Sequence, residues 1–353
     1  MTSFREGIVR DVIATHDGLM RIVVAIESDE VNASVFTDLT GDVAPGDRVV
    51  VNALGLDLDL GTGGEGFVLW NLSRPGRANI SPGHIVKLRY TPLQTNVLAA
   101  ESPESDHHEA LRDVLSIEGM PVVACGLHSQ IAAAAAGIKA GAPGARIAYV
   151  MSDGASLPLA WSDLVRAVKK AGLVDVTCTY GHAFGGDLEA VNVFSALAAV
   201  RKAAAADAAI VAMGPGVVGT GTALGFTAME QGMVLDATQA LEGVPIACLR
   251  ISFHDERTRH RGISHHSVTA LTVGARARAI VAVPDLGDHS SDIHRSLQRI
   301  AERHALVEAD GRPGIALMEE RGIRPLSMGR PYEQIPELFL AAAAAGAVAA
   351  SHL

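Results

Sequence analysis

The side chains best suited to chemistry in this sequence are concentrated in one short segment, residues 257–266. It contains three arginines, three histidines and one serine: Arg257, Arg259, His260, Arg261, Ser264, His265 and His266. A guanidinium group can bind a carboxylate or phosphate through two parallel hydrogen bonds, and a histidine exchanges protons near neutral pH. We therefore predict that Arg259 and Arg261 bind a ligand and that His260, His265 and His266 act as acids or bases.

Two other interpretations of this segment stay open. His260 could bind a metal ion together with His265 or His266, but the prediction assigns no metal and leaves any cofactor unknown. Alternatively, the segment could start a helix capped by Ser264, with its basic side chains on the surface. A basic run in a chain of formal net charge -10 favours a functional role over a solvated face.

A second candidate is the glycine-rich segment 214–222 (GPGVVGTGT), which contains the pattern G-x-G-x-x-G. Glycines let the backbone approach a ligand closely, and a following helix would offer free N–H groups to an anion. The predicted ligand-binding residues here are Gly214, Gly216, Gly219, Thr220, Gly221 and Thr222. A tight strand-to-helix connection without a ligand would explain the same glycines. A dinucleotide is disfavoured because no acidic residue ends the next strand about twenty residues later.

Further polar residues follow other predicted strands. His182 and Asp153 are predicted to act as catalytic or orienting groups, and the ligand-binding candidates beside them are His128, Gly154, Gly185, Gly186 and Asp187. For Asp153, Asp187 and His128 the alternative is a turn or helix cap.

The strands and helices predicted around these residues place them at a common location. From Met120 onward, apolar strand-like runs alternate with helical stretches, which predicts a mostly parallel sheet with helices on both faces, a Rossmann-like α/β fold. The expected strands are 121–125, 145–151, 174–179, 208–213, 245–252, 278–283 and 306–309, and the expected helices are 129–140, 160–171, 188–206, 222–241, 264–273 and 290–304. Because ligands bind beyond the carboxyl ends of parallel strands, we expect the candidates to meet at that edge.

The region before this domain has a different pattern. Short β-branched runs at 7–14, 19–27, 48–53, 66–71 and 84–90 predict a small all-β barrel or sandwich. The expected organisation is an all-β domain at 1–90, a linker and helix at 91–119 with the helix at 107–116, and the α/β domain at 120–353.

Composition excludes several classes of partner. The net charge of -10 argues against binding nucleic acid or an anionic membrane surface. Three widely separated cysteines indicate a reducing compartment, so we expect a cytoplasmic protein. The alanine-rich segment 338–350 is too short to span a bilayer and predicts a buried or subunit-packing helix, from which we expect a homodimer.

Motifs along almost the whole chain, among them APGDRVVVNALGLDLDLGTGG, HAFGGDLEAVNV and RHRGISHHS, resemble the bacterial domain-of-unknown-function family 3866. That resemblance implies no particular activity. SDGASLP at 152–158 and GTGTALG at 219–225 are also similar to segments of the B component of glycine, sarcosine and betaine reductases. The reductases use cysteine or selenocysteine on the second segment, where this chain has none, so only the scaffold and site location would be shared.

These observations lead to two functional hypotheses. The first is an enzyme acting on a small anionic metabolite, such as an amino-acid-like carboxylate, at the carboxyl edge of the sheet. The second is a non-catalytic protein that binds a metabolite or serves as a scaffold.

Overall fold

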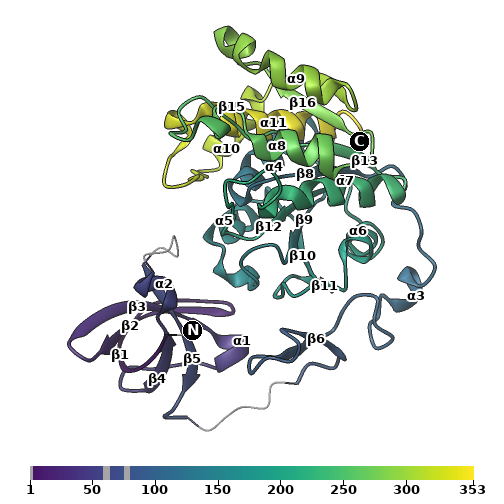
Figure 1. Ribbon diagram of the computed structural model, residues 1–353. Helices are drawn as coiled ribbons and strands as arrows, with labels where there is room; N and C mark the ends of the chain where they lie inside the picture. The colour runs from purple at the N-terminus through teal and green to yellow at the C-terminus, as the bar shows by residue number, and fades with distance from the viewer. Residues whose placement is uncertain (1–2, 59–63, 75–79) are drawn as a thin grey trace. The chain divides into compact units, whose positions relative to one another are not determined.

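The computed structural model describes residues 3–58, 64–74 and 80–353, apart from the side chains of Asp288 and Asp292. Its contacts divide the chain into two compact units, residues 1–96 and 97–353. The first contains a closed β-barrel and the second an eight-stranded parallel sheet with helices (Figure 1). The predicted pairing of a small barrel with a Rossmann-like α/β fold is confirmed.

The barrel consists of β1 (Phe4–His16), β2 (Leu19–Ile26), β3 (Asp29–Phe36), β4 (Arg48–Asn52) and β5 (Glu65–Asn71). Its strands follow the order β1-β2-β3-β5-β4, and β4 pairs with β1 to close it. Alternate side chains of β2, including Ile22 and Val24, point into an aliphatic core, as a half-buried strand requires. Short helices α1 (Thr37–Thr40) and α2 (Leu54–Asp57) lie between strands.

The structure differs from the expectations for residues 1–119 at three points. Strand β3 was not predicted, because its polar residues Asn32 and Ser34 hide the strand pattern; the buried Ser34 hydroxyl instead donates to Glu65. The strand expected at 84–90 is reduced to β6 (Ile85–Lys87), which pairs outside the barrel with β7 (Thr95–Val97). The helix expected at 107–116 shortens to α3 (His108–Leu111).

The large sheet has the strand order β11-β10-β9-β12-β8-β13-β16-β17, and every pairing in it is parallel. Its strands are β8 (Pro121–Ala124), β9 (Ile147–Ser152), β10 (Val176–Tyr180), β11 (Leu188–Ala190), β12 (Ala208–Met213), β13 (Val244–Ala247), β16 (Ile280–Pro284) and β17 (Ala305–Ala309). The central strands β8, β9 and β12 are buried along their whole length. This burial explains why they read as continuous apolar runs.

Helices cover both faces of the sheet. One face packs against α4 (Ile131–Gly141), α5 (Asp163–Lys170), α10 (Arg312–Glu320) and α11 (Pro336–Ala350). The other packs against α6 (Val193–Lys202), α7 (Glu230–Ala240), α8 (His265–Thr269) and α9 (His294–Ala301). The connection after β8 therefore crosses one face, while the connections after its neighbours β12 and β13 cross the other. Such a switch opens a crevice at the carboxyl end of the sheet.

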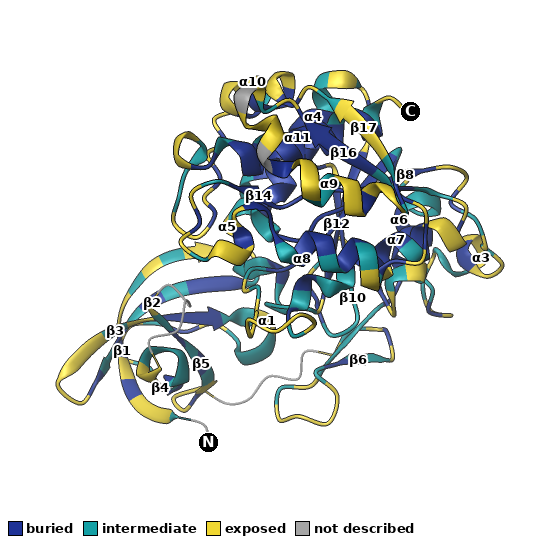
Figure 2. Cartoon of the chain, turned by 45° about the horizontal axis from the view of Figure 1, so that its top comes forward, coloured by how far each residue is buried: buried dark blue, intermediate teal, exposed yellow. Residues whose placement is uncertain are grey.

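The alanine-rich C-terminal helix α11 is buried inside the second unit, against α4 and α10 (Figure 2). Glycines allow this close contact, because a Cβ added to Gly137 would lie 2.2 Å from the carbonyl oxygen of Ala343. The apolar surface of α11 is thus covered by its own chain. An exposed apolar helix would have supported a homodimer, but α11 is not exposed. The homodimer therefore stays a prediction without this support.

Two predicted helices begin five or more residues later than expected. In the segment predicted as helix 188–206, Leu188–Ala190 pairs with β10 as a strand, and Asn192 caps a helix that starts at Val193. In 222–241 the chain first turns back, with Gly219 bridged to Phe226, so that α7 starts only at Glu230. In both cases the predicted helix included a preceding segment that does not form an α-helix.

Candidate functional site

A small hairpin positions the basic segment at the carboxyl edge of the sheet. Beyond β13, β14 (Ile251–Ser252) pairs antiparallel with β15 (Gly262–Ile263), so residues 253–261 form the loop between them. Ser264 then caps α8, its hydroxyl accepting a hydrogen bond from the His266 N–H. The capping interpretation is correct, but the histidines are not on the surface: His260 and His266 are 1% and 5% exposed.

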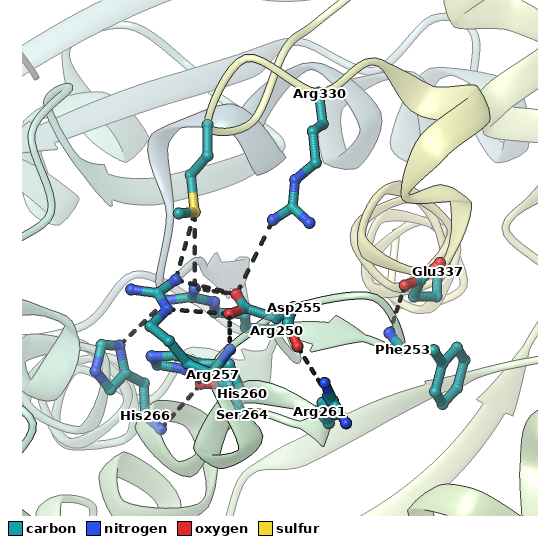
Figure 3. A network of polar contacts seen from close by, with 11 residues as sticks. Arg250, Phe253, Asp255, Arg257, His260, Arg261, Ser264, His266, Arg330 and Glu337 are labelled. Atoms are coloured by element: carbon teal, nitrogen blue, oxygen red, sulfur yellow. Dashed lines mark hydrogen bonds and ion pairs between the residues drawn. The ribbon is translucent and has the colours of Figure 1, made fainter.

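Asp255 lies at the centre of an arginine cluster (Figure 3). Its buried carboxylate accepts two hydrogen bonds of 3.0 Å from the Arg257 guanidinium. Arg250 and Arg330 approach the same carboxylate at 3.6 and 3.9 Å. The Arg250 side chain is buried, so its charge needs a partner, and Asp255 is that partner. Three guanidinium groups therefore face one carboxylate.

A pocket of about 440 Å³ borders this cluster, lined by Asp255, Arg257 and Arg330 together with His254, Glu256, Met328 and Gln334. Met328 lies in a tight turn in which Ser327 and Arg330 exchange backbone hydrogen bonds. Its sulfur lies 3.7 Å from Arg257 Nη2 and 4.0 Å from Arg250 Nη2. The turn thus brings both Met328 and Arg330 onto the arginine cluster.

The three predicted histidines meet beside the arginines. Their ring centroids are 5.1 Å apart for His260 and His265, 4.8 Å for His260 and His266, and 4.4 Å for His265 and His266. His260 Nδ1 lies 2.7 Å from the Ser264 hydroxyl, and His266 Nδ1 lies 3.3 Å from Arg250 Nη1. His265 Nε2 is buried and has no hydrogen-bond partner among the described residues.

Burial and the neighbouring arginines keep the histidines neutral. Burial, followed by the charge of Arg250, lowers the pKa of His260 to about 4 and that of His266 to about 3. Burial and then Arg259 lower the pKa of His265. Burial and then Arg257 lower the pKa of Arg250 to about 10. Burial alone would raise the pKa of Asp255, but the hydrogen bonds and charge of Arg257 outweigh it and lower that pKa. The site thus combines neutral imidazoles with excess positive charge.

The second half of the glycine segment lies against this cluster. A Cβ added to Gly219 would lie 3.4 Å from the His266 ring, and one added to Gly221 would lie 3.7 Å from Arg259 Nη1. Phe226 stacks on His266, with ring centroids 4.0 Å apart and planes inclined by 5°. The glycine segment and the histidine segment therefore lie together, as expected from the sequence. Part of the reasoning behind that expectation was wrong.

No helix begins at Thr222 to bind an anion through its N-terminus. The Thr220 hydroxyl lies 3.0 Å from that of Thr222 and donates to the Gly225 carbonyl, while the Gly225 N–H donates to the Thr222 hydroxyl. These bonds close the loop on itself, and α7 starts eight residues after Thr222. The proposed anion cradle at a helix N-terminus was wrong.

The first half of the glycine segment lines a different pocket, of about 240 Å³, that also contains His128 and Met328. Gly214 and Gly216 contribute to it, in the crevice where the connections after β8 and β12 diverge. His128 Nδ1 lies 3.1 Å from the Met213 carbonyl oxygen, and Nε2 lies 2.6 Å from the Ser162 hydroxyl. A carbonyl only accepts, so Nδ1 carries the proton and Nε2 accepts from Ser162. Burial lowers the pKa of His128 to about 4.

Asp153 belongs to a further polar cluster on the same edge. Its carboxylate accepts the His182 N–H at 2.9 Å, and Gly181 leaves room for it. Next to it, the Ser152 hydroxyl donates to Glu230 Oε1 at 2.6 Å, at the start of α7. Burial, opposed by the bond from Ser152, and the charge of Asp153 together raise the pKa of Glu230 to about 7. The Asp153 carboxylate thus contacts the backbone of His182.

Residues 32–346 match the family described as "Protein of unknown function (DUF3866)". The chain belongs to this family. The predicted family resemblance is therefore confirmed. The match begins within β3, so it leaves out the barrel strands β1 and β2, and it spans nearly all of the α/β unit. A comparison with curated proteins finds no match.

In this DUF3866 chain, residues 219–225, which resemble a segment of the reductase B component, contain no cysteine. Cys125, Cys178 and Cys248 are all buried: Cys178 lies within β10, and the other two directly follow β8 and β13. No helix among the described residues is long and apolar enough to cross a membrane.

Three further predicted residues support the fold locally. Asp187 accepts hydrogen bonds from Lys169 and from the backbone and hydroxyl of Thr177, so it does not cap a helix. Although burial would raise its pKa, the bonds from Lys169 and Thr177 lower it. The N–H groups of Gly185 and Gly186 are directed at Glu189 Oε1. Among the basic residues, Arg261 donates to the Asp255 carbonyl, and Arg259 is exposed.

Sequence reasoning missed Asp255, Arg330 and Glu230 as site residues. Asp255 had a usable signal, because it follows a strand and precedes Arg257 by two residues. Glu230 was placed inside a long helix, where its position at an N-terminus was hidden. Arg330 comes from a segment with no strand or helix pattern, and only tertiary folding brings it to Asp255.

Proposed function

We propose that this protein binds a small anionic metabolite, with a carboxylate or phosphate group, in the pocket beside Asp255, Arg257 and Arg330. One observation carries the proposal: three guanidinium groups converge on one carboxylate at the border of a 440 Å³ pocket, in a chain with a net charge of -10. Excess positive charge at a concave site attracts an anion and orients it through paired N–H donors.

Arg330 is the arginine best placed to receive the ligand. It is partly exposed, lines the pocket, and approaches Asp255 only at 3.9 Å, whereas Arg257 is already engaged through two hydrogen bonds. An anion entering the pocket can therefore recruit the Arg330 guanidinium without breaking a strong bond. Arg259, beside the glycine loop, extends the positive surface toward Gly221.

The catalytic and the non-catalytic hypotheses share this binding step, and a titration tests it. Inorganic phosphate and succinate are titrated by calorimetry into the chelator-treated 353-residue chain at constant ionic strength. We expect saturable binding that Arg330→Met weakens at least about tenfold, the loss of one charged hydrogen-bonding group. Arg324→Met, an exposed change in the same segment, serves as the matched control. Absence of saturable binding of both anions, or equal affinity in Arg330→Met, refutes the proposal.

A further inference from the structure

We infer that His260, His265 and His266 form a binding site for one divalent transition-metal ion of the zinc type. This inference goes beyond the anion site, because it concerns a different set of donor atoms. One nitrogen from each ring lies within 4.8 Å of the other two. Imidazole nitrogen is a preferred ligand of Zn²⁺, and three histidines with an open fourth position are the ligand set of a catalytic zinc site.

The surroundings of His260 and His265 suit this role. The Ser264 hydroxyl lies 2.7 Å from His260 Nδ1 and fixes that ring, which leaves Nε2 for a metal. Metal-binding histidines characteristically make such a hydrogen bond through their other nitrogen. His265 Nε2 is the stronger indication: it is buried and lacks a partner among the described residues, in a protein where buried polar atoms are normally paired. A bound metal would satisfy it.

The distances between the ring nitrogens are compatible with a site whose three rings move closer together when a metal ion binds. Zinc–nitrogen bonds of about 2.0–2.1 Å place tetrahedral ligands roughly 3.4 Å apart. The observed nitrogens, within 4.8 Å of one another, reach that spacing through small side-chain rotations. The rings come from one short helix and the turn before it, so these rotations need no rearrangement of the sheet.

His266 is the ligand that must change partner. A guanidinium only donates, so the 3.3 Å contact with Arg250 makes His266 Nδ1 an acceptor and places the proton on Nε2. Metal binding therefore displaces Arg250 from His266, and Asp255, 3.6 Å from Arg250, is available to take it. The positive charge of Arg250, Arg257 and Arg259 opposes a bare cation, so an anion is the expected fourth ligand.

Zinc binding to the full chain, prepared without a histidine tag and stripped with a chelator, tests the inference. Calorimetry with a competing chelator measures stoichiometry and affinity for Zn²⁺, and Co²⁺ absorption reports the geometry. We expect one Zn²⁺ per chain and a tetrahedral Co²⁺ spectrum. Losing a ligand should weaken binding more than about 100-fold, since even outer-shell partners cost 10- to 100-fold.

His265→Phe is the main variant, because it keeps a ring packed against Phe226 while removing both ring nitrogens, of which the buried Nε2 has no hydrogen-bond partner among the described residues. His260→Gln is the second, and His352→Gln, an exposed change at the C-terminus, is the control. Circular dichroism checks that each variant is folded. Fewer than about 0.2 Zn²⁺ per chain, or an unchanged affinity in both site variants, overturns the inference. The anion titration uses metal-free protein and Arg330→Met, so either proposal can fail without the other.

Discussion

Glu230 offers a direct test of the electrostatics at the carboxyl edge. Its carboxyl group is largely buried beside Asp153, accepts one hydrogen bond from Ser152, and has a pKa raised from 4.5 to about 7. A carboxyl group whose pKa is higher in the folded than in the unfolded state stabilises the fold while it is protonated. That contribution is complete below pH 4.5 and is lost as the pH rises through 7.

The magnitude follows from the size of the shift. Each pKa unit is worth about 1.4 kcal/mol, so a shift of this size gives roughly 2–3 kcal/mol once solvent screening of the partly exposed group is allowed for. Glu230→Gln replaces the acid by a neutral group of the same shape. We therefore expect the free energy of unfolding of Glu230→Gln minus that of the wild type to grow by roughly 2–3 kcal/mol between pH 4.5 and 7.5.

Urea unfolding at intervals of half a pH unit measures this difference, and titrations common to both proteins cancel. Glu320→Gln, at an exposed position of α10, is the matched control, and the difference for Glu230→Gln should grow more between pH 4.5 and 7.5 than the difference for Glu320→Gln. A flat difference for Glu230→Gln, or one that falls with rising pH, would refute the argument that burial beside Asp153 holds this proton.

Three further predictions concern stability and are measured by urea unfolding. Gly137→Val should destabilise the α/β unit by about 3 kcal/mol or more, because a Cβ there would lie 2.2 Å from the Ala343 carbonyl, whereas Gly144→Ala, with open space around it, should be nearly neutral. Asp255→Asn should cost about 3 kcal/mol, since it leaves the buried Arg250 without its counter-charge, and the exposed neighbour change Glu256→Gln should cost little; equal effects would contradict the buried network. Ser162→Ala should cost about 1–2 kcal/mol, because Ser162 caps α5 and also donates to His128 at 2.6 Å, while Ser351→Ala at the exposed C-terminus should cost under half of that.

The sequence by itself determined the architecture and the edge of the sheet that carries the polar residues. Short β-branched runs before Tyr90 and apolar runs alternating with helices after Met120 were enough for the barrel and the parallel sheet. Both signals are local, because a strand buried on both faces must be apolar throughout. The parallel topology then required every loop after a strand to emerge at one edge, which is why His260, His265 and His266 could be grouped with the glycine segment.

Only the tertiary structure decided which of those side chains meet. Arg330 reaches Asp255 from a turn without regular structure, and Glu230 reaches Ser152 because α7 starts later than its apolar pattern indicates. The same apolar pattern in α11 was compatible with a subunit interface or a buried helix, and the close approach of Gly137 to Ala343 selects burial within the chain. Pairings between distant segments depend on packing across the whole core, and no local sequence window contains that information.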